Sequence, residues 1–142
     1  MSSDVSLPEV KQVMLNADCL FNQTQVHAAL DVMAENITAE LKDTNPLLLC
    51  LMSGAMVVGG KLLPRLNFPL QLDYIHATRY RNSTAGFELE WLVKPRHDLK
   101  DRTVLIVDDI LDEGITMHEV LQFCRNEGAK AVYSAVLVEK HH

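Results

Sequence analysis

Apolar residues recur along the chain in patterns that predict both helices and strands. A helix between residues 22 and 43 would carry its apolar side chains on one face, namely Val26, Ala29, Leu30, Met33, Ile37 and Leu41. Asn22 stands directly before this stripe and can cap the helix. The segment is therefore predicted to be an amphipathic helix, whereas residues 8–20 fit either a short helix or a loop.

Two continuous apolar runs have the length of strands that are buried on both faces, as in parallel sheets. They are "PLLLCLM" at residues 46–52 and "TVLIV" at residues 103–107. Helical spacing follows the first run and returns at about residues 116–126, before Gly128. A further strand, "AVYSAVLV", is predicted at residues 131–138.

Apolar and polar residues alternate between positions 70 and 93, in Leu70, Leu72 and Tyr74 and again in Phe87, Leu89 and Trp91. A polar stretch at 81–86 separates them, which predicts two strands joined by a loop. Strands that alternate with helices indicate an α/β domain with a mainly parallel sheet. Ligands of such sheets bind beyond the carboxyl ends of the strands.

Composition narrows the class of protein. The 142 residues, 48% of them apolar, suit one domain, and the net charge of −6 argues against a nucleic-acid binder. No apolar run approaches about 18 residues and no signal peptide opens the chain, so we expect neither membrane insertion nor export but a cytoplasmic protein. The three cysteines form no CxxC pair and are expected to be free, small buried residues.

The segment "VLIVDDILDEGITM", residues 104–117, places four carboxylates next to a buried strand. Asp108 and Asp109 come directly off that strand, where adjacent charges repel and removal from water is costly. Sugar hydroxyls and a divalent cation would compensate such acceptor oxygens. Asp112 and Glu113 could instead simply cap the following helix, because carboxylates favour the positive end of a helix dipole.

The second half of this segment has the features of an anion site. Residues 112–116 turn into a helix N-terminus, where free backbone N–H groups attract anions. Gly114 allows close approach of the backbone, and the Thr116 hydroxyl adds a donor. Acids that bind hydroxyls, followed by a turn that binds phosphate, together suit a ribose 5-phosphate.

The same segment resembles the phosphoribosyl-pyrophosphate signature of the type I phosphoribosyltransferases, and Asp112 resembles the 6-oxopurine branch. "LLLCLMSGAM", "LQLDYIHATRY" and "AVYSAVLVEK" follow the order expected of hypoxanthine-guanine phosphoribosyltransferases, so that the resemblance covers about residues 22–140. It implies the type I phosphoribosyltransferase fold, a mainly parallel twisted sheet flanked by helices, with an antiparallel lid hairpin. It also implies a core domain at 22–142, a hood or flexible segment at 1–21, and a homodimer or homotetramer.

The resemblance implies roles for individual residues around a phosphoribosyl pyrophosphate. Asp108 and Asp109 would hold the ribose hydroxyls, partly through Mg²⁺ and its waters. Asp112 would lie near purine N7 and transfer a proton. The 5-phosphate would be cradled by Asp112, Glu113, Gly114, Ile115 and Thr116.

Three further elements complete the implied site. The pyrophosphate loop would be Met52, Ser53 and Gly54, which in relatives carries a non-proline cis peptide before its second residue. The lid would contain Arg79, Tyr80 and Arg81. Lys140 would read the 6-oxo group of the purine.

The implied reaction is phosphoribosyl transfer to hypoxanthine or guanine, giving IMP or GMP and pyrophosphate, with Mg²⁺ as cofactor. The chain departs from the family pattern at Ser53, where many relatives carry a lysine, and at Glu113, where Thr or Ser is usual. Relatives also continue beyond Lys140 with an aromatic residue and an acid. We therefore expect either a longer protein or an inactive product.

Two alternatives stay open. A phosphoribosyltransferase-fold regulator that senses nucleotides and binds nucleic acid would keep the phosphate turn, although the acidic balance and Asp112 count against it. An enzyme that prefers xanthine or adenine would share the same motifs.

Overall fold

The computed structural model describes residues 5–82, 86–111 and 114–140. The elements along the chain are α1 (Leu7–Asn16), α2 (Gln23–Leu41), β1 (Leu47–Leu51), α3 (Ala55–Leu62), the 3-10 turn η1 (Leu63–Arg65), β2 (Gln71–Asn82), β3 (Gly86–Val93), β4 (Thr103–Leu111), α4 (Ile115–Asn126) and β5 (Ala131–Glu139). None of the described helices is long and apolar enough to cross a membrane.

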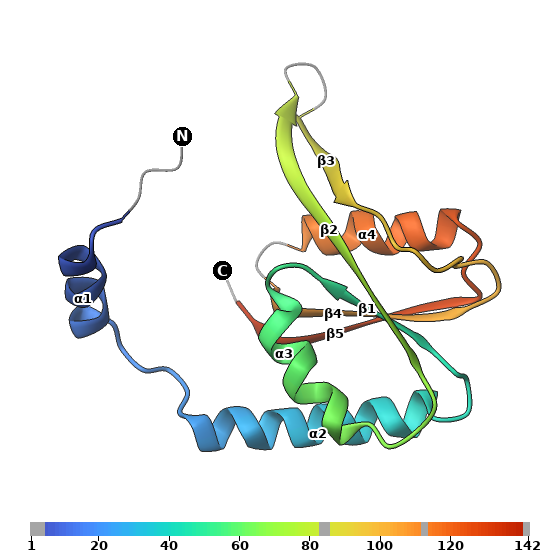
Figure 1. The fold of residues 1–142 in the computed structure, drawn as a ribbon, viewed down its shortest axis with the longest axis horizontal. Coiled ribbons are helices and arrows are strands. Elements are labelled where there is room, and N and C mark those ends of the chain that lie inside the picture. Colours follow the sequence, from blue (N-terminus) through green and yellow to red (C-terminus); the bar gives the residue numbers. More distant parts are fainter. Residues whose placement is uncertain (1–4, 83–85, 112–113, 141–142) are drawn as a thin grey trace.

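In the described part of the chain, five strands form one sheet in the order β3-β2-β1-β4-β5. The pairs β1–β2, β1–β4 and β4–β5 are parallel, and β2–β3 is antiparallel. This arrangement confirms the predicted α/β fold with a mainly parallel sheet and an antiparallel hairpin. Figure 1 shows the β2–β3 hairpin extending beyond the rest of the sheet.

Helices cover both faces of the sheet (Figure 1), with α2 and α3 on one face and α4 on the other. Strand β1 is buried along its whole length because alternate side chains enter the two cores. Leu48 and Cys50 pack under α2 and α3, while Leu47, Leu49 and Leu51 pack on the side of α4. The continuous apolar run in the sequence reflects this burial on both sides.

The first two helices differ in how they are held. Asn22 caps α2 through a capping box, in which its Oδ1 accepts from Gln25 N and its own N–H donates to Gln25 Oε1, each at 2.8 Å. Helix α1 forms from the segment that fitted either a helix or a loop, because Ser6 caps it and Pro8 occupies its first turn. No α1 residue is buried, and Figure 1 shows it apart from the sheet.

Three details differ from the sequence-based expectations. Strand β4 continues from Val107 to Leu111, because β5 pairs with it as far as Glu139, so both aspartates lie inside the strand. On β2, the alternating Leu72 and Tyr74 are nearly half exposed, and the buried face carries Asp73, Ile75 and Ala77. It is the face with Ile75, and not the face with Leu72 and Tyr74, that packs on the core beneath α4.

The third difference concerns the thiols. Cys50 and Cys124 are buried, as predicted, and burial raises the pKa of Cys50 and raises that of Cys124 to about 11. The prediction was wrong for Cys19, which lies between α1 and α2 in a segment whose residues are all exposed. All three are free thiols.

Candidate functional site

A cavity of about 280 Å³ lies where the carboxyl ends of β1 and β4 meet the start of α4. The two strands are parallel neighbours, with Cys50 opposite Val107, so their ends reach the same edge of the sheet. The cavity brings together six residues that the sequence singled out, Met52, Gly54, Arg79, Asp108, Gly114 and Thr116. Their convergence is a property of the fold, because they come from four separate segments of the chain.

The turn after β1 lies directly against the acids of β4. A Cβ on Gly54 would come within 2.6 Å of Asp109 Oδ1 and 2.9 Å of Asp108 Oδ1. The backbone of Gly54 has ordinary right-handed helical angles, so glycine is required here by space and not by conformation. This contact fixes the distance between the loop and the carboxylates.

The loop itself contains the expected cis peptide bond, between Met52 and Ser53. Met52 N–H donates to the carbonyl oxygen of Ile75 at 2.8 Å, and the Ser53 carbonyl oxygen accepts from Met56 N at 3.1 Å. These bonds tie one end of the loop to β2 and the other to α3. The side chain of Ser53 is exposed. It stands at the position where many members of the family that the sequence resembles carry a lysine.

Asp108 and Asp109 form a short network within β4. The backbone N–H of Asp109 donates to Asp108 Oδ1, and that of Ile110 donates to Asp109 Oδ1, both at 2.8 Å. Burial raises the pKa of Asp108 to about 6. The charge of Asp109 also raises it, whereas the hydrogen bond from the backbone N–H of Asp109 lowers it. An electropositive or hydroxyl-bearing partner would therefore stabilise the ionised pair.

The described carboxylates suit a magnesium ion that shares its ligands with a substrate. Within the described ranges, no group of three or more His, Cys, Asp or Glu side chains could hold a metal alone. Mg²⁺, however, is commonly bound by one or two carboxylates together with water and substrate oxygens. Asp108 and Asp109 offer a donor set of that kind.

The turn into α4 is the predicted phosphate-binding segment. Gly114, with φ of +80°, lies directly before the helix, and its carbonyl oxygen accepts from His118 N at 2.9 Å. The free N–H groups of the first turn thus lie next to the cavity that Thr116 lines. Asp112 and Glu113 lie outside the described residues, and of Ile115 the structure describes only the backbone.

The predicted lid residues lie on β2, in the hairpin. Arg79 lines the cavity. Tyr80 and Arg81 pair through their backbones with Glu88 and Phe87 on β3, and their side chains lie outside what the structure describes. The hairpin therefore borders the cavity, and the roles of its residues in a lid stay predictions.

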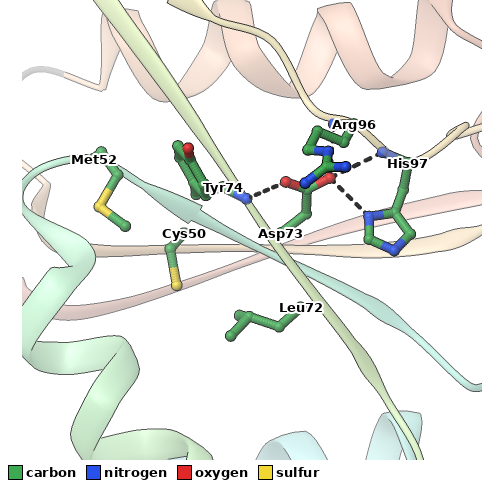
Figure 2. A pocket seen from close by; sticks show the side chains of 7 residues that line it. All are labelled: Cys50, Met52, Leu72, Asp73, Tyr74, Arg96 and His97. Atoms are coloured by element: carbon green, nitrogen blue, oxygen red, sulfur yellow. Dashed lines mark hydrogen bonds and ion pairs between the residues drawn. The ribbon is translucent and has the colours of Figure 1, made fainter.

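A feature that the sequence reasoning missed anchors the base of this hairpin (Figure 2). Asp73 Oδ2 accepts from the backbone N–H groups of Arg96 and His97, at 2.7 and 2.9 Å, and lies 2.8 Å from His97 Nδ1. Its Oδ1 accepts from Tyr74 N at 2.7 Å. Burial by itself raises the pKa of Asp73, but the bonds from His97, Tyr74 and Arg96 outweigh it and lower the pKa.

This network ties β2 to the segment between β3 and β4, beside a second cavity of about 550 Å³. The sequence holds one signal of this network. Asp73 stands within the apolar alternation of β2, and a carboxylate at such a position needs partners if it faces inward. The partners come from 23 and 24 residues later in the chain, and no local pattern identifies them.

Lys140 does not line the first cavity. Its backbone N–H donates to the carbonyl oxygen of Leu111 at 2.8 Å, which places it beside the end of β4. It lines a separate cavity of about 570 Å³, and Ile110 lines both this cavity and the first. The structure thus brings Lys140 to the neighbourhood of the acids but into a different compartment.

Comparison with known proteins shows which family the chain resembles. Residues 16–142 match the family model described as "Phosphoribosyl transferase domain". A hypoxanthine-guanine-xanthine phosphoribosyltransferase of Tritrichomonas foetus is 31% identical over 72% of this chain and 56% of its own length. A hypoxanthine-guanine phosphoribosyltransferase of Bacillus subtilis is 25% identical over 85% of this chain and 68% of its own length.

Solved structures share the fold. A hypoxanthine phosphoribosyltransferase from Trypanosoma cruzi, solved in complex with the product IMP, has a TM-score of 0.77 at 24% identity and covers 85% of this chain and 70% of its own. The chain spans little more than half the length of the trichomonad protein. Because the family model matches almost the whole sequence, the chain belongs to the phosphoribosyl transferase domain family.

Proposed function

We propose that this chain transfers the 5-phosphoribosyl group of phosphoribosyl pyrophosphate to hypoxanthine or guanine, giving IMP or GMP and pyrophosphate. The observation that carries the proposal is the cavity at the end of β4, which Gly54, Asp108 and Thr116 line together. The names of the trichomonad and bacillary relatives support the choice of purines.

The ribose 5-phosphate is proposed to bind across β4 and α4. The backbone groups of residues 112–116 and the Thr116 hydroxyl would hold the phosphate at the helix N-terminus. Asp108 and Asp109 would accept hydrogen bonds from the ribose hydroxyls and hold Mg²⁺ through them. When bound, Mg²⁺ would neutralise charge on the leaving pyrophosphate.

In the proposed reaction, purine N9 bonds to ribose C1 as the bond from C1 to the pyrophosphate oxygen breaks. Asp112 takes the proton that the purine loses, which contributes roughly 10²–10⁴-fold if it acts as an ordinary general base. The loop of Met52, Ser53 and Gly54 holds the pyrophosphate, and Lys140 donates to the purine 6-oxo group. Arg79, Tyr80 and Arg81 close over the site and exclude water.

Several finer points belong to the same proposal. The enzyme would act in the cytoplasm as a homodimer or homotetramer. Xanthine is a further candidate base, because the trichomonad relative carries xanthine in its name. A regulatory role for the same fold would need the phosphate turn but not proton transfer by Asp112.

The test is formation of nucleotide from phosphoribosyl pyrophosphate and Mg²⁺, with hypoxanthine, guanine, xanthine and adenine assayed in parallel. Turnover of hypoxanthine or guanine that falls at least a hundredfold in Asp112→Asn would support both the reaction and the base. No turnover of any base would contradict the proposal. Binding of nucleotide without turnover, together with retention on heparin at low salt, would favour the regulator.

A further inference from the structure

The cavity that Lys140 lines has the character of a site for a flat, mostly apolar ring. Its walls come from Phe21, which precedes the cap of α2, from Val26 in the first turns of α2, from Ile110 on β4 and from Leu137 on β5. Gln25, Glu139 and Lys140 add polar groups at its margin. Apolar walls with a few polar groups are typical of sites for small heterocycles.

Ile110 connects this cavity to the one that Asp108 lines. It belongs to the lining of both and is 45% exposed. Asp108 stands two residues earlier on β4, on the same side of the strand. A ligand with its sugar phosphate at Asp108 and Thr116 would therefore place its ring past Ile110, toward Phe21.

The position of Phe21 is fixed although its side chain is exposed. It directly precedes Asn22, whose capping box sets the start of α2, and its carbonyl oxygen accepts from Cys19 Sγ at 3.3 Å. The side chain is 57% exposed, which is unusual for a large aromatic residue beside an apolar cavity. It is thus available to a ligand.

A purely structural role is the competing explanation. Phe21 stands at the position before the cap and Val26 at the fourth residue of the helix, where a pair of apolar residues stabilises the entry into a helix. Such a pair needs only bulk, so Leu would serve as well as Phe. Stacking on a base needs the ring itself.

We propose that Phe21 is a base-binding residue, whose ring packs on the face of a purine that lies between it, Ile110 and Lys140. The inference rests on the proposed function, since it takes the ligand of the first cavity to be a purine nucleotide. It adds a residue from outside the strand and turn motifs, contributed by the segment that precedes α2.

The test compares equilibrium binding of GMP and of ribose 5-phosphate, which lacks the base, by calorimetry with Mg²⁺ present. Phe21→Ala and Phe21→Leu should each weaken GMP binding about tenfold, the order expected for loss of one aromatic stacking partner. Both should bind ribose 5-phosphate as the unchanged protein does. Leu15→Ala, which alters an even more exposed apolar residue on α1, should change neither affinity.

Phe21→Leu separates the two explanations, because it keeps the helix entry and its melting temperature while removing the ring. GMP binding by Phe21→Leu equal to that of the unchanged protein would overturn the proposal, as would equal weakening of both ligands or no binding of GMP by the unchanged protein. Selective loss of GMP without any turnover by the unchanged protein would support Phe21 and contradict the transferase. Turnover by the unchanged protein, together with GMP binding that the Phe21 substitutions leave unaffected, would contradict the role of Phe21 and support the transferase.

Discussion

The backbone of Gly54 lies so close to Asp109 that a Cβ at position 54 would be 2.6 Å from the carboxylate oxygen Oδ1. The contact joins the turn after β1 to the end of β4, two segments that are more than 50 residues apart in the sequence. It sets the geometry of the cavity, because neither the turn nor the strand can move without affecting the other.

Gly54→Ala should displace either the loop or the aspartates and reduce phosphoribosyl pyrophosphate binding by tenfold or more. The added methyl group should also destabilise the fold by about 1–3 kcal/mol, as overpacking generally does. Gly60→Ala is a matched control on the same helix, since a Cβ there meets nothing within 4 Å and should stabilise by about 0.5–1 kcal/mol. Titration with phosphoribosyl pyrophosphate and urea denaturation of both variants are the measurements. Equal ligand affinities and equal free energies of unfolding for the two variants would contradict the prediction.

Asp73→Asn should destabilise the protein by about 1.5–3 kcal/mol, the usual value of hydrogen bonds to a charged group. Asparagine keeps one acceptor oxygen and replaces the other with an amide that cannot accept from Arg96 and His97. Asp98→Asn, an exposed acid in the same segment, should stay within about 0.5 kcal/mol. The free energy of unfolding by urea is the measurement, and similar values for both variants would refute the anchoring role.

Asp108 should make the ligand-free protein less stable as the pH rises. Its pKa is about 6 in the fold and lies near 4 in an unfolded chain, so the folded state binds the extra proton between these values. The favourable contribution is therefore complete below about pH 4 and is lost as the pH rises through about 6. Asp108→Asn should remove this dependence, raising stability at pH 8 while abolishing nucleotide binding, and denaturation at pH 4, 6 and 8 checks it.

Thiol reactivity should separate the cysteines into two classes. Cys19 is exposed and should react with a disulfide reagent within seconds to minutes in the native protein. Cys50 and Cys124 should react only on unfolding, because burial removes them from the reagent and raises their pKa values above the ordinary range. The measurement is the number of thiols that react before and after addition of urea, and Cys19→Ser, which should show no reactive thiol in the native state, is the control. More than one thiol that reacts in the native protein would contradict the prediction.

Local sequence alone predicted a large part of this fold. The cap at Asn22 and the apolar stripe after it predicted α2, and the runs at residues 46–52 and 103–107 predicted the buried parallel strands. The acids and the turn into α4 were identifiable because they are contiguous, so one short segment carries most of the proposed chemistry. That segment also carried the resemblance to the phosphoribosyltransferases, and the match of residues 16–142 to the family model confirms the family.

Only the tertiary structure decided which distant residues meet. A strand's alternation defines two faces but not which of them a neighbour will cover, and on β2 the face with Asp73 is the buried one. The same holds for Gly54 against Asp109 and for Phe21 beside Ile110 and Lys140, whose positions depend on strand order and on where α2 begins. The sequence thus determined the local elements and their chemistry, whereas packing between elements decided the site's shape, because contacts across a sheet have no period along the chain.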